Sequence, residues 1–211
     1  TTVDMETGRI IYPDNYTFDG TFATDKSWCS DPAWILYDLL TTDKGFGGPN
    51  GIIDENTLDV YGFYSASVYN STEIYDPLTK TTEPRFSCHV VLNTQNDAYT
   101  LINDLCAVMR ATPFYSAGAL TLAQDRPNNI VSNTSEPQYI FTNSNVSKDG
   151  FSYKGVGDKT KYTEVEVAYF DNDTQTLNFE HVSADDIATL SGYTAKFGTI
   201  RKTLKSFACT S

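Results

Sequence analysis

The chain has 211 residues, of which 40% are hydrophobic and 13% aromatic; this excludes a disordered protein and allows one large domain or two small ones. Its formal net charge of −12 argues against adhesive binding to a nucleic-acid phosphate backbone. No apolar run approaches the roughly 18 residues of a membrane span, and the first residues show neither an initiator Met nor a signal peptide. We therefore expect the sequence to be part of a longer chain.

The first predicted elements are a short strand at 8–12 and a helix at 31–41. Asp31 can cap this helix and Pro32 suits its first position, while large apolar side chains around most of its circumference predict that it is buried. The glycine cluster "GFGG" at 45–48 follows the helix. A phosphate-binding loop needs its glycines before a helix, where free N–H groups face the anion. We therefore interpret the cluster as a structural turn.

The middle of the chain alternates between helical and extended patterns. We expect a helix at 54–68, an exposed loop at 71–83, a strand at 84–93, a helix at 97–110 ended by Pro113, and a hairpin at 114–127 that turns at Ala117-Gly118. The strand places Cys88 on its apolar side and His89 on its polar side. The residues at helical spacing in the first of these helices are Leu58, Tyr61, Ser65 and Val68, and in the second Leu101, Ile102, Leu105, Cys106 and Met109.

The pattern changes after a stretch rich in Asn, Ser and Thr at 128–148. Alternating side chains predict strands, and a Ser183 cap with acids in the first turn predicts a helix at 183–191. The strands are expected at 149–155, 161–171, 174–182 and 198–209. The fold class is therefore α+β, with a helix-and-sheet lobe at 1–136 and a strand-rich lobe at 137–211 that continues beyond the given sequence.

No pattern in the sequence indicates a catalytic, cofactor or metal site. Nothing resembles a nucleophile elbow or a cysteine-protease signature. The cysteines lack metal-ligand spacing and only two histidines accompany them, which favours free core thiols at Cys29, Cys88, Cys106 and Cys209.

Weaker chemical signals have structural interpretations. Glu164 and Glu166 share one strand face about 6–7 Å apart, which we interpret as a solvated face rather than a glycosidase pair. The "DND" at 171–173 lacks the remainder of a calcium-binding loop and is interpreted as a tight turn. Five glycosylation sequons carry little weight in a chain this rich in Asn, Ser and Thr; they begin at Asn15, Asn70, Asn133, Asn145 and Asn172.

A series of motifs, in order along nearly the whole chain, carries a family resemblance. The motifs are "YPDNYTFDGTF" at 12–22, "DPAWILYDLLT" at 31–41, "TEPRFSCHVVL" at 82–92, "INDLCAVMRATP" at 102–113, "GALTLAQDRP" at 118–127, the "VSKDGFSYKG" and "EVEVAYFD" segments, and the terminal "KSFACTS". In this order they resemble the central tail-tip proteins of bacteriophages with long non-contractile tails, the family of tip attachment protein J.

The resemblance implies a structural virion protein at the tail tip rather than an enzyme. Members form a trimeric hub that closes the tail tube and continues its channel, for host attachment and genome ejection. The implied partners are two further copies of the chain, other tail-tip and tail-tube proteins, the tape-measure protein, and DNA that passes without specific binding. The resemblance carries over no catalytic, cofactor-binding or metal-binding residue.

The distribution of charge suggests an orientation for such a hub. Residues 1–60 hold eleven acids and three bases, a net of −8, whereas residues 196–211 hold four bases and no acid. We hypothesise that acids, including Glu164 and Glu166, face the channel and repel DNA, and that the basic strand faces a neighbouring subunit.

An alternative is an extracellular, β-rich module that binds or cleaves glycans, which the many aromatic residues and the sequons favour. A groove lined by exposed Trp or Tyr with paired acids would support this alternative. Burial of Trp34 and Tyr37 would count against it.

Overall fold

The structure is a computed structural model that describes residues 1–22, 27–47, 53–76, 80–92, 97–127, 141–155, 157, 161–171, 174–187 and 190–208. The chain divides into two units, one of Thr1–Asp125 with Phe207–Ser211 and one of Arg126–Ser206. Along the sequence, the second unit is therefore inserted into the first. The lobe boundary expected near residue 136 lies outside the described residues.

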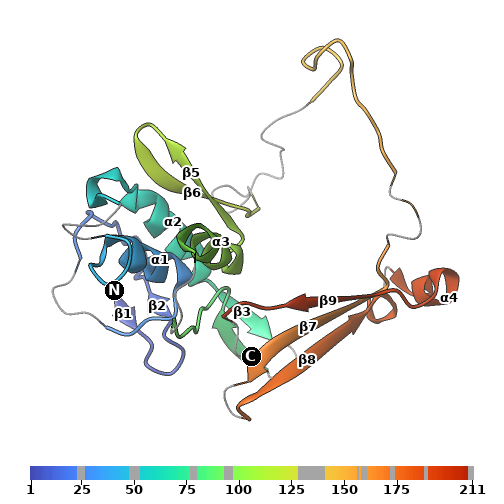
Figure 1. The fold of residues 1–211 in the computed structure, drawn as a ribbon, viewed down its shortest axis with the longest axis horizontal. Helices are drawn as coiled ribbons and strands as arrows, with labels where there is room; N and C mark the ends of the chain where they lie inside the picture. The colour runs from blue at the N-terminus through green and yellow to red at the C-terminus, as the bar shows by residue number, and fades with distance from the viewer. Residues whose placement is uncertain are drawn as a thin grey trace. The chain divides into compact units, whose positions relative to one another are not determined.

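Three helices, α1 (Pro32–Thr41), α2 (Val60–Asn70) and α3 (Ala98–Val108), pack together in the first unit (Figure 1). Each begins after an aspartate whose carboxylate accepts a hydrogen bond from a backbone N–H of the first turn; these caps are Asp31, Asp59 and Asp97. The predicted helices at 31–41 and 97–110 are confirmed, because the apolar pattern of each, and the Asp31 cap of the first, are local signals.

The core of the first unit lies between the three helices. Its largest fully buried apolar side chains are Leu36, Leu40, Phe63, Leu105 and Met109. The predicted burial of α1 holds for most of its circumference, but Trp34, Ile35 and Leu39 are only partly buried. In α3 the predicted stripe is confirmed, with Leu101, Leu105 and Cys106 buried and Ile102 packed against the core.

The prediction for the helix at 54–68 was wrong in its start and its buried face. A 3₁₀ turn, η1 (Glu55–Thr57), comes first, and α2 begins only after Asp59. Tyr61 and Val68 are exposed, with 56% and 38% of their surface accessible. The side chains that α2 buries are Phe63, Ala66, Ser67, Tyr69 and Asn70. The two polar ones, Ser67 and Asn70, point inward because they donate hydrogen bonds to the buried Asp31 carboxylate.

Three two-stranded antiparallel sheets accompany these helices: β1 (Thr2–Val3) with β2 (Ile10–Ile11), β3 (Glu73–Asp76) with β4 (Thr81–Pro84), and β5 (Ala111–Ser116) with β6 (Ala119–Gln124). The short strand at 8–12 is confirmed as β2. The hairpin turn is also confirmed, because Ala117 and Gly118 have φ of 52° and 86° and join Ser116 to its partner Ala119.

Three predictions for this region were wrong. The segment at 71–83 contains the β3–β4 hairpin rather than a loop, and Pro113 lies within β5, after α3 has ended. The described part of 84–93 continues beyond β4 as an extended segment outside any sheet. Its N–H groups bond to several separate segments instead: Cys88 donates to the Ser30 carbonyl at 2.8 Å, and His89 donates to the Ala208 carbonyl at 2.9 Å.

The glycines after α1 have the structural role that their position predicts. A β-carbon on Gly45 would overlap the carbonyl of Leu39, and one on Gly47 would overlap the backbone of Thr41. The chain therefore returns against the end of the helix so closely that any side chain at either position is excluded.

The second unit contains a three-stranded sheet in the order β8-β7-β9 (Figure 1). The central strand β7 (Glu164–Asp171) pairs antiparallel with β8 (Thr176–Ser183) and parallel with β9 (Arg201–Lys205). These strands confirm the alternating patterns at 161–171 and 174–182, and a shorter part of the one at 198–209. Between β8 and β9 the chain forms a 3₁₀ turn, η4 (Ala184–Asp186), and a short helix, α4 (Tyr193–Phe197).

Two predictions for the second unit were wrong. Residues 149–155 form no strand. Ser183 and Asp186 form the expected capping box, but it holds only η4; the α-helix starts after Gly192, which has φ of 85°. Asp185 links the two, because its carboxylate accepts the N–H of Gly192 at 2.9 Å.

Candidate functional site: an aromatic cavity beside helix α1

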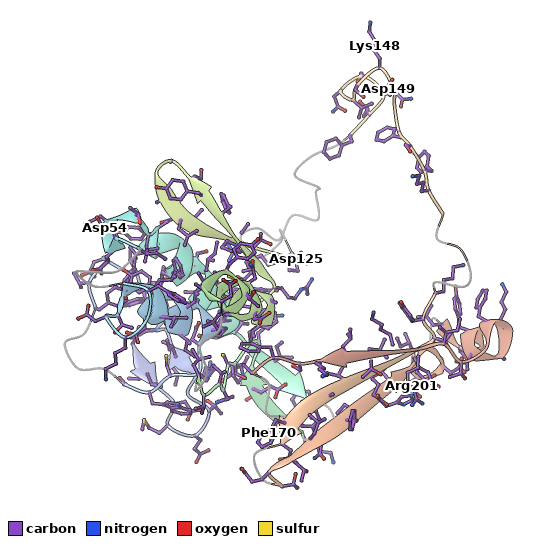
Figure 2. The ribbon with its side chains drawn as sticks, viewed as in Figure 1. Asp54, Asp125, Lys148, Asp149, Phe170 and Arg201 are labelled. Atoms are coloured by element: carbon purple, nitrogen blue, oxygen red, sulfur yellow. The ribbon has the colours of Figure 1, made fainter. Side chains whose placement is uncertain are left out.

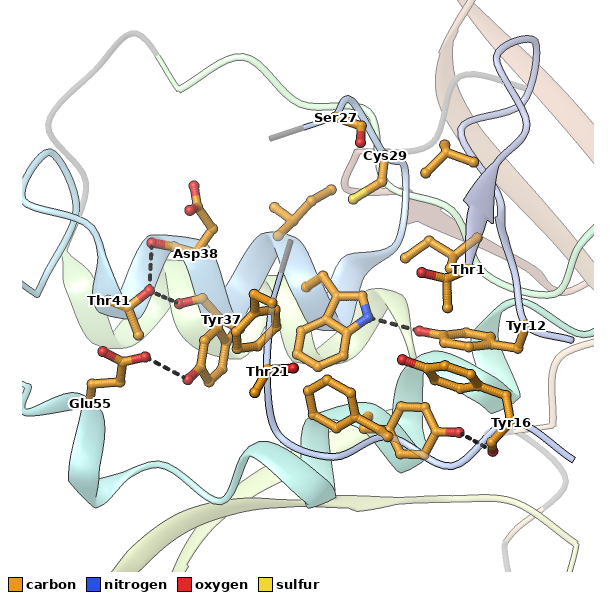
Figure 3. A pocket seen from close by; sticks show the side chains of 17 residues that line it. Thr1, Tyr12, Tyr16, Thr21, Ser27, Cys29, Tyr37, Asp38, Thr41 and Glu55 are labelled. Carbon is orange, nitrogen blue, oxygen red and sulfur yellow. Dashed lines mark hydrogen bonds between the residues drawn. The ribbon is translucent and has the colours of Figure 1, made fainter. Parts of the chain in front are cut away.

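A cavity of about 600 Å³ lies in the first unit beside α1 (Figure 3). This volume is within the range of pockets that hold small molecules or parts of peptides. Its wall comes from the N-terminal strands, the segment after β2, α1, η1 and α2. Seven of the 17 residues that line it are aromatic: Tyr12, Tyr16, Phe18, Phe22, Trp34, Tyr37 and Tyr64.

The aromatic rings support one another. Phe18 stacks on Tyr64 with ring centroids 5.1 Å apart, and Phe22 meets Trp34 edge to face at 5.3 Å. Trp34 in turn meets Tyr37 edge to face at 5.7 Å. Aromatic pairs of this kind contribute roughly 0.5–1.5 kcal/mol each beyond their burial. The rings of the cavity wall therefore stabilise one another, even though Phe22 is half exposed at 49%.

A chain of hydrogen bonds connects this wall to the core. The indole N–H of Trp34 donates to the Tyr12 hydroxyl at 2.9 Å, which lies 2.6 Å from the Ser67 hydroxyl. Ser67 donates to Asp31 at 2.6 Å, and Asn70 and the Ala33 N–H also donate to this carboxylate. The same aspartate thus caps α1 and holds the end of α2.

Burial dominates the acid–base properties of these groups. It raises the pKa of Tyr12 to about 12, although the hydrogen bonds with Ser67 and Trp34 act in the opposite direction. It also raises the pKa of Asp31 above its usual range, against the lowering effect of the bonds from Ser67 and Asn70. The hydrogen bonds to Asp31 hold α1 and α2 together.

One end of the cavity is acidic. Figure 3 shows Asp38, Thr41 and Glu55 gathered near the C-terminal end of α1, away from Tyr12 and Tyr16. The Tyr37 hydroxyl donates to the Glu55 carboxylate at 3.2 Å. Burial and then the charge of Glu55 raise the pKa of Tyr37 to about 12, so this hydroxyl stays protonated and remains a donor.

A second group of charges lies on the sheet of the second unit. Arg201 contacts Glu164 at 3.1 Å and Glu166 at 3.4 Å, His181 lies 3.3 Å from Glu164, and Thr203 donates to Glu166. The hydrogen bond from His181, followed by that from Arg201, holds the pKa of Glu164 below its usual value. Both glutamates are therefore bound to Arg201, which does not match a glycosidase pair, one of whose carboxyl groups must be a protonated acid.

The charged and apolar parts of this sheet are separate. Figure 2 shows Arg201 and Phe170 towards opposite ends of the sheet. The register places Phe170 opposite Leu177 and Ala168 opposite Phe179, on the same face as Glu164 and Glu166 but farther along β7.

The cysteines show no sign of reactivity. Burial raises the pKa of Cys88 to about 11 and that of Cys106 to about 12, and these two and the half-buried Cys29 are free thiols. Cys209 lies outside the described residues. His89 is half-buried, and its ring lies 6.3 Å from that of Trp28. No group of three or more metal-ligating side chains occurs in the described part of the chain.

The sequons differ in accessibility. Asn70 is fully buried and its amide bonds to Asp31, so it is not accessible to glycosylation in the folded chain. Asn145 is exposed, Asn15 is exposed in a turn, and Asn133 and Asn172 lie outside the described residues.

Comparison with known proteins identifies the family. No family model matches the chain. Tip attachment protein J of Escherichia phage SECphi27 is 34% identical over 175 residues, which cover 77% of this chain and 13% of that protein. Its counterpart in Escherichia phage SECphi4 is 28% identical over 171 residues, covering 76% of this chain and 14% of that protein.

The chain is homologous to phage tip attachment protein J. The resemblance inferred from the motifs is confirmed, and the homology implies a virion protein of the phage tail tip. The chain spans only about 13–14% of the length of these tip attachment proteins. No helix in the described parts of the chain has the length and apolar character needed to cross a membrane.

The sequence alone did not predict the cavity. The motif "YPDNYTFDGTF" contributed to the resemblance, but its four aromatic residues were not interpreted as a cluster. The sequence did contain a signal for such a cluster: this polar segment has four large aromatic residues, and their spacing fits neither a helix nor a strand. Their common partner, α1, comes later in the chain, and so the concave wall becomes visible only in three dimensions.

Proposed function

We propose that the chain is part of the structural hub of a phage tail tip, which closes and continues the tail tube and serves host attachment and genome delivery. The observation that carries the proposal is the 34% identity to tip attachment protein J of Escherichia phage SECphi27. The proposed role is mechanical and non-catalytic, with no cofactor and no metal.

The exposed apolar faces of the second unit support a role within an assembly. Its sheet exposes large apolar side chains on both faces, with accessible fractions between 46% and 58%: Phe170, Leu177 and Phe179 on one face, and Val182 and Leu204 on the other. Contiguous apolar surface of this kind on a soluble unit marks a site of association. We propose that neighbouring subunits or tail-tip proteins cover it.

The proposed partners are two further copies of the chain, other tail-tip and tail-tube proteins, the tape-measure protein, and DNA in transit. The net charge of −8 on residues 1–60 supports passage of DNA without adhesion. Glu164 and Glu166 contribute little to this repulsion because Arg201 pairs with both. Because Arg201 is already paired with these glutamates, the contact that we propose between β9 and an acidic neighbouring subunit does not involve Arg201.

Two experiments on virions test the proposal. Antibodies raised against the 211-residue chain should label the tail tip in electron microscopy, and labelling of the capsid or tail shaft would refute the location. Chemical cross-linking of intact virions should trap three copies of the full protein. A dimer as the largest homomeric product, at saturating cross-linker, would refute the threefold hub.

A variant separates folding from assembly. Phe179→Asp should leave the circular dichroism of the isolated chain unchanged, because this side chain is already exposed to water. In a phage it should abolish plaque formation by placing a charge in an interface, whereas Phe179→Leu should preserve it. Normal plaques from the Asp variant would mean that this face is not covered in the virion.

The glycan-binding alternative has one observation in its favour, the aromatic cavity. Other features oppose it: Tyr37 is buried, Trp34 is half-buried with its N–H already bonded to Tyr12, and the paired acids of the second unit are bound to Arg201. The structural role is therefore the function that we adopt.

A further inference from the structure

The three-stranded sheet of the second unit has two edges, β8 and β9, because β7 lies between them (Figure 1). Within the described part of the chain, residues 177–182 of β8 form no backbone–backbone hydrogen bond outside the ladder with β7. Such an edge strand presents a row of unpaired N–H and C=O groups, which is a template for pairing with another extended chain.

The two edges differ in the features that prevent such pairing. β9 has three basic side chains among its five residues, Arg201, Lys202 and Lys205, and charges of this kind are placed on edge strands to keep other strands away. β8 is eight residues long, pairs with β7 in unbroken register, and contains no Lys, Arg, Pro or Gly. β8 is therefore the edge at which a further strand can add.

The side chains of β8 define the chemistry of a matching strand. They alternate between the two faces of the sheet. Leu177 and Phe179 lie on one face and are 58% and 53% exposed. Glu180 lies on the other face, is exposed, and has neither an ion pair nor a side-chain hydrogen bond within the described residues. Because apolar pairs and opposite charges on neighbouring strands stabilise a sheet, a matching strand is apolar beside Leu177 and Phe179 and basic beside Glu180.

We propose that β8 is the docking site for an extended segment of a neighbouring tail-tip protein, which adds a fourth strand to this sheet. The segment carries apolar side chains beside Leu177 and Phe179 and a Lys or Arg beside Glu180. Pairing of β8 with a second copy of itself would leave Glu180 without a base, since β8 contains none. The assignment to a tail-tip protein rests on the proposed function, whereas the chemistry of the added strand rests on the edge alone.

A designed peptide tests the pairing. The probe is acetyl-Thr-Val-Thr-Lys-Ile-Thr-Val-Thr-amide, which in antiparallel pairing places its Lys beside Glu180, its Ile beside Phe179 and its second Val beside Leu177. It is titrated into the 211-residue chain by isothermal calorimetry. We expect binding at millimolar or lower concentration, and the absence of binding would overturn the proposal.

Two N-methylated forms of the peptide separate pairing at the edge from packing on a face. One form is methylated at the second, fourth and sixth residues, and the other at the third, fifth and seventh. Alternate N–H groups of a strand point to opposite sides, so only one form keeps its donors towards β8. We expect that form to bind like the parent peptide and the other to bind at least about tenfold more weakly. Equal affinities of the two forms would overturn pairing at the edge.

A reversal of charge locates the site. Glu180→Lys changes an exposed side chain and should leave the circular dichroism unchanged, but it should weaken binding of the parent peptide about tenfold. A peptide with Glu in place of its Lys should regain the lost affinity for this variant. The matched control is Glu83→Lys, at an exposed position on β4, which should change neither affinity. An equal effect of the control, or no recovery with the Glu peptide, would overturn the placement beside Glu180.

Other outcomes identify a different occupant or a different failure. A dimer of the chain in sedimentation equilibrium that the peptide dissociates would make a second copy the occupant and overturn the heterologous partner. Failure of the peptide experiments would overturn the docking site and leave the hub to antibody labelling and cross-linking of virions. If the peptide binds as expected but antibody labelling fails, the docking edge stands and its assignment to a tail-tip partner is overturned.

Discussion

Replacing Leu36 by Ala should destabilise the first unit by about 3–4 kcal/mol. Leu36 is 1% exposed and belongs to a core cluster that includes side chains from all three helices. Losing three buried carbons forfeits about 2.4 kcal/mol at roughly 0.8 kcal/mol each, and a cavity that collapses only partly adds about 1 kcal/mol or more. The matched control is Val68→Ala on the exposed side of α2, which should change the stability by less than about 0.5 kcal/mol.

The assay is urea unfolding followed by tryptophan fluorescence. Both tryptophans of the chain, Trp28 and Trp34, belong to the first unit, so the signal reports on this unit and not on the inserted one. The free energies follow from linear extrapolation with a shared slope. A loss below about 1 kcal/mol for Leu36→Ala, or a similar loss for the control, would refute the placement of α1 in the core.

Three further predictions concern a carboxyl group, a glycine and the thiols. Because burial raises the folded-state pKa of Asp31, its stabilising contribution is present below the unfolded-state pKa and is lost as pH rises through the folded-state pKa. The variant Asp31→Asn keeps a capping side chain but does not titrate, so its stability relative to the parent should increase as the pH of the urea titration rises. A difference in stability that stays constant with pH would contradict this. Gly47→Ala should lower the unfolding midpoint because its β-carbon would overlap the backbone of Thr41, whereas an unchanged midpoint would mean that the loop yields freely. Thiol titration of unreduced protein should find Cys88 and Cys106 protected in the native state and four reactive groups after unfolding; two groups would reveal a disulfide.

Helices with local signals were predictable from the sequence. An aspartate cap followed by regularly spaced apolar residues is enough to locate α1 and α3, because both cap and stripe lie within one segment. The glycine turn after α1 and the β5–β6 hairpin were predictable for the same reason. Their backbone conformations depend on the residues in the turn itself.

Elements that depend on distant partners were not predictable. The buried face of α2 includes Ser67 and Asn70, which look solvent-exposed until the Asp31 carboxylate is placed beside them. The extended segment around Cys88 alternates like a strand, yet its N–H groups bond to separate segments of the chain. The β3–β4 hairpin has a polar sequence that turn signals alone cannot distinguish from a loop.

The candidate site was only partly predictable. The family resemblance gave its biological setting, and the acidic balance of residues 1–60 indicated the charge of its surroundings. The cavity itself depends on rings from β2, the following segment, α1 and α2 meeting in space, and no spacing rule connects them. In the second unit, the pairing of Glu164 with Arg201 follows from the parallel β7–β9 register, which the sequence does not specify.

The insertion of the second unit has a consequence for the synthesis of the protein on the ribosome. The carbonyl of Ala208 accepts the amide of His89, and Phe207 and Ala208 pack against the core of the first unit. These last contacts cannot form until the inserted Arg126–Ser206 has been translated, which takes roughly 4–16 seconds at about 5–20 residues per second. During that interval the nascent first unit lacks its closing segment, and this is when we expect chaperones and proteases to have their best access to it.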